Sequence, residues 1–253
     1  MHRSASRLTR VLACAAVPVI LTVAGCSSDS GKESGSNGSK KSGSSASAKP
    51  DAKSSKALEK AAFATLPDPC KALGTATIDT LVPDAKDKNG TAAKANDLAA
   101  NASCTWNGLD DDGLKGSQYR WLSLSYFRTD SHATLGDANK RAEEQYNKTV
   151  EGAKTTEGAL DPKAEAAAGV GDQATSVVYT VKKDGDYYNT TVVARTQNVV
   201  ITLDYNGAGL EGAGAPDHGK LLQDAIAAAK EAVTSVDTAN KAPAEQPQSP
   251  APQ

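Results

Sequence analysis

Cysteine has the most reactive side chain in this chain, and its four copies lie in different settings. Cys14 sits inside an apolar run, Cys26 directly follows the small pair Ala24-Gly25, and Cys70 and Cys104 lie far downstream. A thiol placed directly after a short apolar run and two small residues can carry a diacylglycerol thioether once the peptide bond before it is cut. We therefore predict lipidation at Cys26, with Cys14 lost in the removed segment.

The residues before Cys26 have the three parts of a secretory signal. Arg3, Arg7 and Arg10 form a basic start without any acidic residue, and an apolar run from Val11 to Val23 follows. That run is too short to span a bilayer. We predict that residues 1–25 are a lipoprotein signal peptide and that the protein is held on the extracytoplasmic face of the cell membrane by its lipid. The alternative is a soluble protein that is released after cleavage.

The two downstream cysteines are the only thiols left after cleavage and lipidation. In an oxidising compartment unpaired thiols are a liability, so we expect a disulfide between Cys70 and Cys104. The alternative is two thiols that are buried separately.

Composition divides the rest of the chain into three parts. Of the 30 residues 27–56, 16 are Ser or Gly and none is an apolar residue larger than Ala, so this stretch cannot form a core. We predict a lipidated cysteine and flexible Ser/Gly/Lys linker over 26–57, a globular domain over 58–238, and a disordered Pro-rich tail over 239–253.

The charge of the predicted domain disfavours nucleic acid as a partner. Residues 57–238 hold 18 basic and 26 acidic side chains, which gives a formal net charge of −8. A surface of this sign repels phosphate backbones, and no basic stripe with interleaved aromatic residues occurs.

Alternating apolar residues predict strands, and apolar residues at helical spacing predict helices. We expect strands at 103–106, 119–128, 175–181, 187–196 and 199–205, with helices beginning near Pro69, Thr75 and Asp137 and one over 222–236. Tight turns fit Asp184-Gly185 and Gln197-Asn198. Strands joined by short turns, with helices between groups of strands, favour a single α+β domain. Its antiparallel sheet would have about five strands, helices packed on one face, and one disulfide.

Three short motifs together resemble a known family. They are Asp68-Pro69-Cys70, Cys104-Thr105-Trp106 and the turn Gly169-Val170-Gly171-Asp172-Gln173-Ala174. In this order behind a lipidation motif, they resemble the actinobacterial lipoproteins of domain-of-unknown-function family 3558. The resemblance implies a bridge between the first two motifs and an extracytoplasmic location. It implies no catalytic residue, because the family has no established activity.

Residues 207–212 spell Gly-x-Gly-x-x-Gly, the pattern of a dinucleotide-binding loop. That loop needs a βαβ unit, whereas here the following helix leads into the Pro-rich tail with no second strand. We therefore expect the Gly-rich stretch 207–214 to be a flexible loop and predict no cofactor.

Candidates for catalysis or metal binding are few. His132 and His218 are the only histidines after Cys26, and neither lies in a nucleophile motif or at zinc-ligand spacing from the other. The acidic run 110–113 lacks the alternating ligands and distal Glu of a calcium loop. We predict no catalytic residue and no metal, and we interpret Trp106 and Trp121 as core residues rather than a sugar platform, to be tested first if exposed.

These observations lead to three hypotheses. The first is a non-enzymatic binding or accessory module of the cell envelope, anchored to the membrane at Cys26, which recognises a small ligand, a wall component or an envelope protein. The second is an envelope hydrolase-type enzyme whose site the sequence does not reveal. The third is a structural spacer.

Overall fold

The structure is a computed structural model that describes residues 58–241. The predicted signal peptide, the lipidation site, the linker and nearly all of the tail lie outside these residues. The elements follow in the order η1 (Pro69–Lys71), α1 (Thr75–Leu81), β1 (Thr91–Ala92), β2 (Asn101–Asp111), η2 (Gly113–Lys115), β3 (Ser117–Arg128), α2 (Ala138–Lys154), β4 (Ala159–Ala166), β5 (Gln173–Lys182), β6 (Asp186–Thr196), β7 (Val199–Leu210) and α3 (His218–Asn240).

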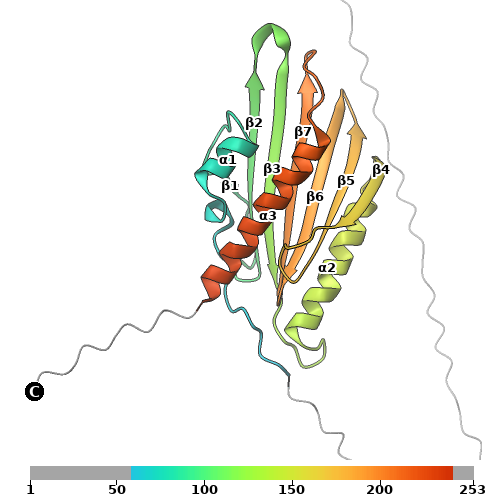
Figure 1. The fold of residues 1–253 in the computed structure, drawn as a ribbon. Helices are drawn as coiled ribbons and strands as arrows, with labels where there is room; N and C mark the ends of the chain where they lie inside the picture. Colours follow the sequence, from blue (N-terminus) through green and yellow to red (C-terminus); the bar gives the residue numbers. More distant parts are fainter. Residues whose placement is uncertain (1–57, 242–253) are drawn as a thin grey trace, which may run out of the picture. The chain divides into compact units, whose positions relative to one another are not determined.

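The strands form one antiparallel sheet in the order β1-β2-β3-β7-β6-β5-β4 (Figure 1). The α+β class is confirmed, but the sheet of residues 58–241 has seven strands where we expected about five. The two extra strands lie at its edges. β1 has only two residues, and β4 has no alternation because nearly all of it is exposed and its register shifts between Leu160 and Lys163. Edge strands of this kind leave little hydrophobic pattern in a sequence.

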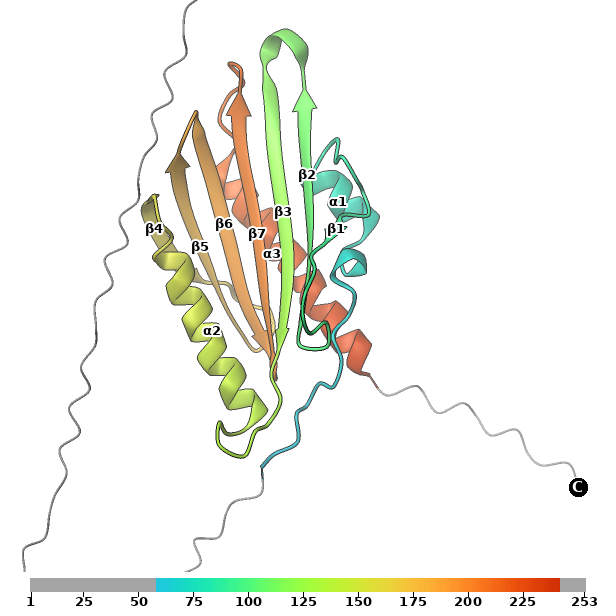
Figure 2. The same ribbon diagram turned by 180° about the vertical axis from the view of Figure 1, so that it is seen from behind.

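Helices cover both faces of the sheet, so the prediction of helices on one face is wrong. Val192 packs in the cluster that contains α3, whereas its neighbour Val193 packs with Ala142 and Tyr146 of α2. Successive side chains of a strand point to opposite faces, so the two helices lie on opposite sides. Figure 1 shows α3 in front of the sheet. Figure 2, the view from behind, shows α2 in front of the sheet.

The larger core lies between α3 and the sheet. Leu122, Leu124 and Ile201 are fully buried on the sheet side, and a row of alanines on α3 lets the helix backbone approach closely. The buried alanines are Ala225, Ala228, Ala229 and Ala232. A tyrosine hydroxyl enters this core with a hydrogen-bond partner. The Tyr205 hydroxyl donates to the Leu81 carbonyl at 2.7 Å, and burial raises the pKa of Tyr205 to about 12.

Cys70 and Cys104 form a disulfide with their Cα atoms 5.2 Å apart. Cys70 lies in η1, where the Asp68 side chain accepts a hydrogen bond from its backbone N–H at 3.0 Å. The predicted bridge is present, and the alternative of two separately buried thiols is wrong. The bridge ties a single 3-10 turn, rather than a longer helix, to the first half of β2.

The second half of the domain follows the sequence pattern closely. β5 and β6 meet through the predicted turn at 184–185, and β6 and β7 meet through Gln197-Asn198, where Gln197 has a φ of 49°. Several boundaries in this half differ from expectation, and two elements extend furthest beyond their expected ends. β7 continues to Leu210, and α3 continues to Asn240, beyond the domain end expected at residue 238.

Candidate functional site between α3 and strands β4 to β6

A cavity of about 430 Å³ opens between the start of α3 and the outer strands. Its floor is set by strand register. Lys163, Val178 and Thr190 form one row across β4, β5 and β6, because Lys163 pairs with Val178 and Val178 pairs with Thr190. Its size is typical of small-molecule sites.

The next row of the floor holds Leu160, Thr180 and Tyr188. The Tyr188 ring lies against the imidazole of His218, with ring centroids 3.7 Å apart and a tilt of 59°. This contact joins β6 to the first residue of α3. It fixes the position of His218 at the rim of the cavity.

The wall opposite the strands is the first turn of α3. Asp217 is the N-cap, and its side chain accepts a hydrogen bond from the Lys220 N–H at 2.8 Å. The unpaired amides of a helix start carry partial positive charge. Leu221 and Leu222, one turn further along, add an apolar part to this wall.

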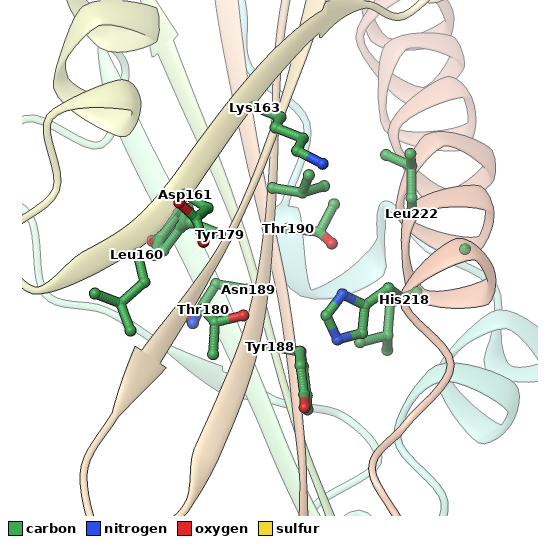
Figure 3. Close-up of a pocket in the computed structure, with 13 residues that line it drawn as sticks. Leu160, Asp161, Lys163, Tyr179, Thr180, Tyr188, Asn189, Thr190, His218 and Leu222 are labelled. Carbon is green, nitrogen blue, oxygen red and sulfur yellow. The ribbon is translucent and has the colours of Figure 1, made fainter.

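Figure 3 shows how the polar groups lie. The Lys163 side chain reaches from β4 toward α3, and the Thr190 hydroxyl and the His218 ring lie on the same side of the strands. Lys163 has no ion-pair partner among residues 58–241, so its ammonium group is available to a ligand. The site therefore combines aliphatic walls with a cation, hydroxyl groups and a helix start.

The two histidines considered for catalysis do not meet. His132 follows β3 at the end of the sheet where Arg128 pairs with Val199, whereas His218 follows β7 at the other end, where Ser117 pairs with Leu210. A shared acid–base pair is therefore absent. The His132 ring instead contacts the Thr134 hydroxyl at 3.0 Å.

The Gly-x-Gly stretch is strand rather than loop at its start, which corrects the prediction for residues 207–214. Gly207 and Gly209 belong to β7. A Cβ atom on Gly209 would lie 2.2 Å from the Gly214 carbonyl oxygen, and one on Gly207 would lie 3.0 Å from an Arg120 nitrogen. The glycines allow the chain to pass over β7 and begin α3.

The tryptophans and the acidic run have structural surroundings. Trp106 is buried and its indole N–H donates to the Lys88 carbonyl at 3.2 Å, whereas Trp121 is only partly buried. Asp111 accepts a bond from the Gly113 N–H at 2.9 Å in the β2–β3 turn. Across residues 58–241 no group of three or more His, Cys, Asp or Glu side chains could hold a metal ion.

Sequence patterns did not reveal most of this site. His218 was considered only as a catalytic base or a metal ligand, and Lys163, Tyr188 and Thr190 were missed. The available signal was weak. Thr190 and Tyr188 alternate with Thr191 and Asn189, so both faces of this part of β6 are polar or aromatic and neither is marked as a ligand wall.

Comparison with known sequences assigns the family. The profile described as "Protein of unknown function (DUF3558)" matches residues 21–190. The chain belongs to the DUF3558 family. The matched region of this DUF3558 protein contains both cysteines of the disulfide and strands β1 to β5, and it ends within β6.

No curated protein matches the chain. Among solved structures, the DUF3558 protein is similar to the crystal structure of LpqN, which is involved in cell envelope biogenesis of Mycobacterium tuberculosis. The identity is 15%, the match covers 56% of this chain and 87% of that chain, and the TM-score is 0.29. In the described part of the DUF3558 chain, no helix has the length and apolar character needed to cross a membrane.

Proposed function

We propose that the protein is a lipid-anchored binding module of the cell envelope, without enzymatic activity, that holds a small ligand in the cavity between α3 and β4 to β6. The ligand has an apolar part and an anionic group. The observation that carries this proposal is the position of the Lys163 ammonium, which has no ion-pair partner among residues 58–241, at a cavity that is also lined by aliphatic side chains of β4, β5 and α3.

The polar rim selects the charge of the ligand. An anion between Lys163 and the first turn of α3 would accept charge-assisted hydrogen bonds and would benefit from the positive end of the helix. Among residues 58–241, Asp161 is the only acidic residue that lines the cavity, and it lies at the exposed bulge of β4. The aliphatic side chains of Leu221 and Leu222 favour an apolar tail beside the anion.

The binding test uses the full chain in an uncharged polyoxyethylene detergent, with hexanoate and hexyl phosphate as anionic probes and hexanol as the neutral control. We expect the anions to bind more tightly than hexanol, and Lys163→Gln to weaken them about tenfold. Lys140→Gln removes the same charge from the exposed surface of α2 and should leave the affinities unchanged. If hexanol bound as tightly as the anions, the proposal of an anion site would be wrong. If none of the three probes bound, the hypothesis of a structural spacer would be favoured.

The lipid anchor has its own test, because Cys26 lies outside the described residues. The motif Ala24-Gly25-Cys26 supports acylation of the thiol. Cys26→Ala should abolish incorporation of a labelled fatty acid and shift the protein out of the detergent phase. Labelling of the variant at the level of the unchanged chain would refute the anchor.

A further inference from the structure

A second hollow lies on the opposite face of the sheet, beyond the end of α2. Its volume is about 430 Å³, and Thr156 and Glu157, which follow α2, form one side. Figure 2 shows that α2 crosses only part of this face, and the upper parts of β3 and β7 have no helix in front of them. Four aromatic side chains line the hollow, namely Tyr119, Trp121, Tyr179 and Tyr187.

Strand register brings these side chains together. Trp121 pairs with Asn206, Asn206 pairs with Asn189, and Asn189 pairs with Tyr179, so one row crosses four strands. In this row two amide side chains lie between two aromatic ones. Residues from β3 and from β5 to β7 therefore reach one surface although they are far apart in the sequence.

The next row forms a raised rim. Tyr119 on β3 and Tyr187 on β6 meet edge to face across β7, with ring centroids 6.3 Å apart and an interplanar angle of 73°. Ala208, the β7 residue that pairs with Tyr119, has only a methyl group, so the rings stand above it without a bulky side chain beneath. Rings held by such contacts present fixed apolar edges to a ligand.

The polar atoms of this surface are available for binding. Within residues 58–241, the Trp121 indole N–H, the Asn206 amide and the Tyr187 hydroxyl have no hydrogen-bond partner. Asn189 uses one N–H for the Tyr187 carbonyl at 2.8 Å, which leaves its side-chain oxygen as an acceptor. The hollow thus offers both donors and acceptors beside aromatic rings.

We propose that this hollow binds a neutral sugar ring of a glycan. A pyranose has C–H faces that pack on aromatic rings and hydroxyl groups that need both donors and acceptors at its edge. One cationic and one acidic residue line the hollow, Lys183 and Glu157, so the lining has no formal net charge and favours an uncharged ligand. Tyr179 and Asn189 line both this hollow and the cavity beside α3, but the two sites open on opposite faces of the sheet, since neighbouring residues of β6 point to opposite faces.

The test compares two adjacent tyrosines of β6. The full chain, in a detergent without a sugar head group, is titrated with the methyl glycosides of glucose, galactose, mannose, arabinose and N-acetylglucosamine and followed by saturation-transfer NMR. We expect at least one glycoside to bind, Tyr187→Ala to weaken it about tenfold, and Tyr188→Ala, on the opposite face, to leave it unchanged.

Asn206→Ala is a second variant, which removes an amide and keeps every aromatic ring. Like Tyr187→Ala, it should weaken glycoside binding. Thermal melts of each variant check that the domain is folded. The proposal is overturned if no glycoside binds, or if the bound glycoside is lost with Tyr188→Ala and retained with Tyr187→Ala and Asn206→Ala.

Discussion

The Glu231 carboxylate accepts a hydrogen bond from the backbone N–H of Gly74, 157 residues earlier in the chain. Gly74 is the N-cap of α1 and has no side chain to cap the helix, which begins at Thr75. The second carboxylate oxygen accepts a bond from the Thr77 hydroxyl at 2.7 Å. Helix α1 is therefore capped by α3.

Replacement of Glu231 should destabilise the domain. Glu231→Ala removes both acceptors from the start of α1, and we expect the free energy of unfolding to fall by about 1 to 2 kcal/mol. Urea unfolding followed by circular dichroism measures the loss. Glu143→Ala, at an exposed position of α2, should change stability by less than about 0.5 kcal/mol. Equal effects of the two variants would contradict the cap.

Reduction of the disulfide should lower stability by about 3 to 4 kcal/mol on the chain-entropy model, because residues 70 and 104 close a loop of intermediate length. Residues 84–101 contain only the two-residue strand β1 and the first residue of β2, and they should lose amide protection before β5 to β7. Thermal melts and hydrogen exchange with and without reductant measure both effects. Identical melts would show that the bridge does not support this region.

Alanine substitutions at Gly90 and Gly113 distinguish the cost of a steric contact from the cost of backbone strain. It has a φ of +73°, and an added Cβ would lie 2.5 Å from the Cys104 sulfur and 2.6 Å from the Trp106 ring. We expect Gly90→Ala to cost about 3 kcal/mol, from strain together with overpacking. Gly113→Ala is the matched control, because Gly113 has a φ of +58° and nothing within 4 Å of an added Cβ. It should cost only the strain, about 1 kcal/mol, so unfolding curves that coincide would rule out the contact.

Asn198 holds the first described residues against the sheet. Its side chain is fully buried, accepts a bond from the Phe63 N–H at 2.8 Å, and donates to the carbonyls of Phe63 and Thr129 at 3.0 and 2.8 Å. Asn198→Ala leaves these backbone groups unpaired and should cost about 3 kcal/mol. Hydrogen exchange should show early loss of protection at residues 58–66. Asn139→Ala, at an exposed amide of α2, should leave that protection unchanged.

The raised pKa of the Asp204 carboxyl predicts that the stability of the domain depends on pH. Burial raises the pKa of this carboxyl, although the Thr191 hydroxyl, which donates to it at 2.6 Å, opposes the shift. Between the unfolded and folded pKa values the native state binds more protons, so its stability falls as the pH rises through that window. Each unit of the shift costs about 1.4 kcal/mol at neutral pH.

Asp204→Asn keeps an oxygen for Thr191 and cannot ionise. It should therefore unfold at a higher urea concentration than the unchanged chain at pH 7, and the difference should shrink below the ordinary pKa of aspartate, about 4. A difference that stayed constant from pH 3 to 7 would contradict the effect of burial on this carboxyl.

Elements whose signals are local could be predicted from the amino-acid sequence. Alternation in Val199 to Tyr205 and the turn residues Asp184-Gly185 and Gln197-Asn198 predicted the β5–β6–β7 meander. The cysteine count predicted the disulfide, since only two thiols remained to pair.

The layering of these elements could not be predicted from local patterns and follows from long-range packing. The spacing of Ala142 and Tyr146 marks an apolar stripe on α2 but does not say which face of the sheet receives it. The consecutive buried residues Val192, Val193 and Ala194 were the available sign that the sheet is covered on both sides. The cap from Glu231, the cavity beneath Lys163 and the aromatic row at Trp121 all join residues far apart in the chain. Sequence periodicity describes one element at a time, whereas strand order and register decide which of these distant side chains become neighbours.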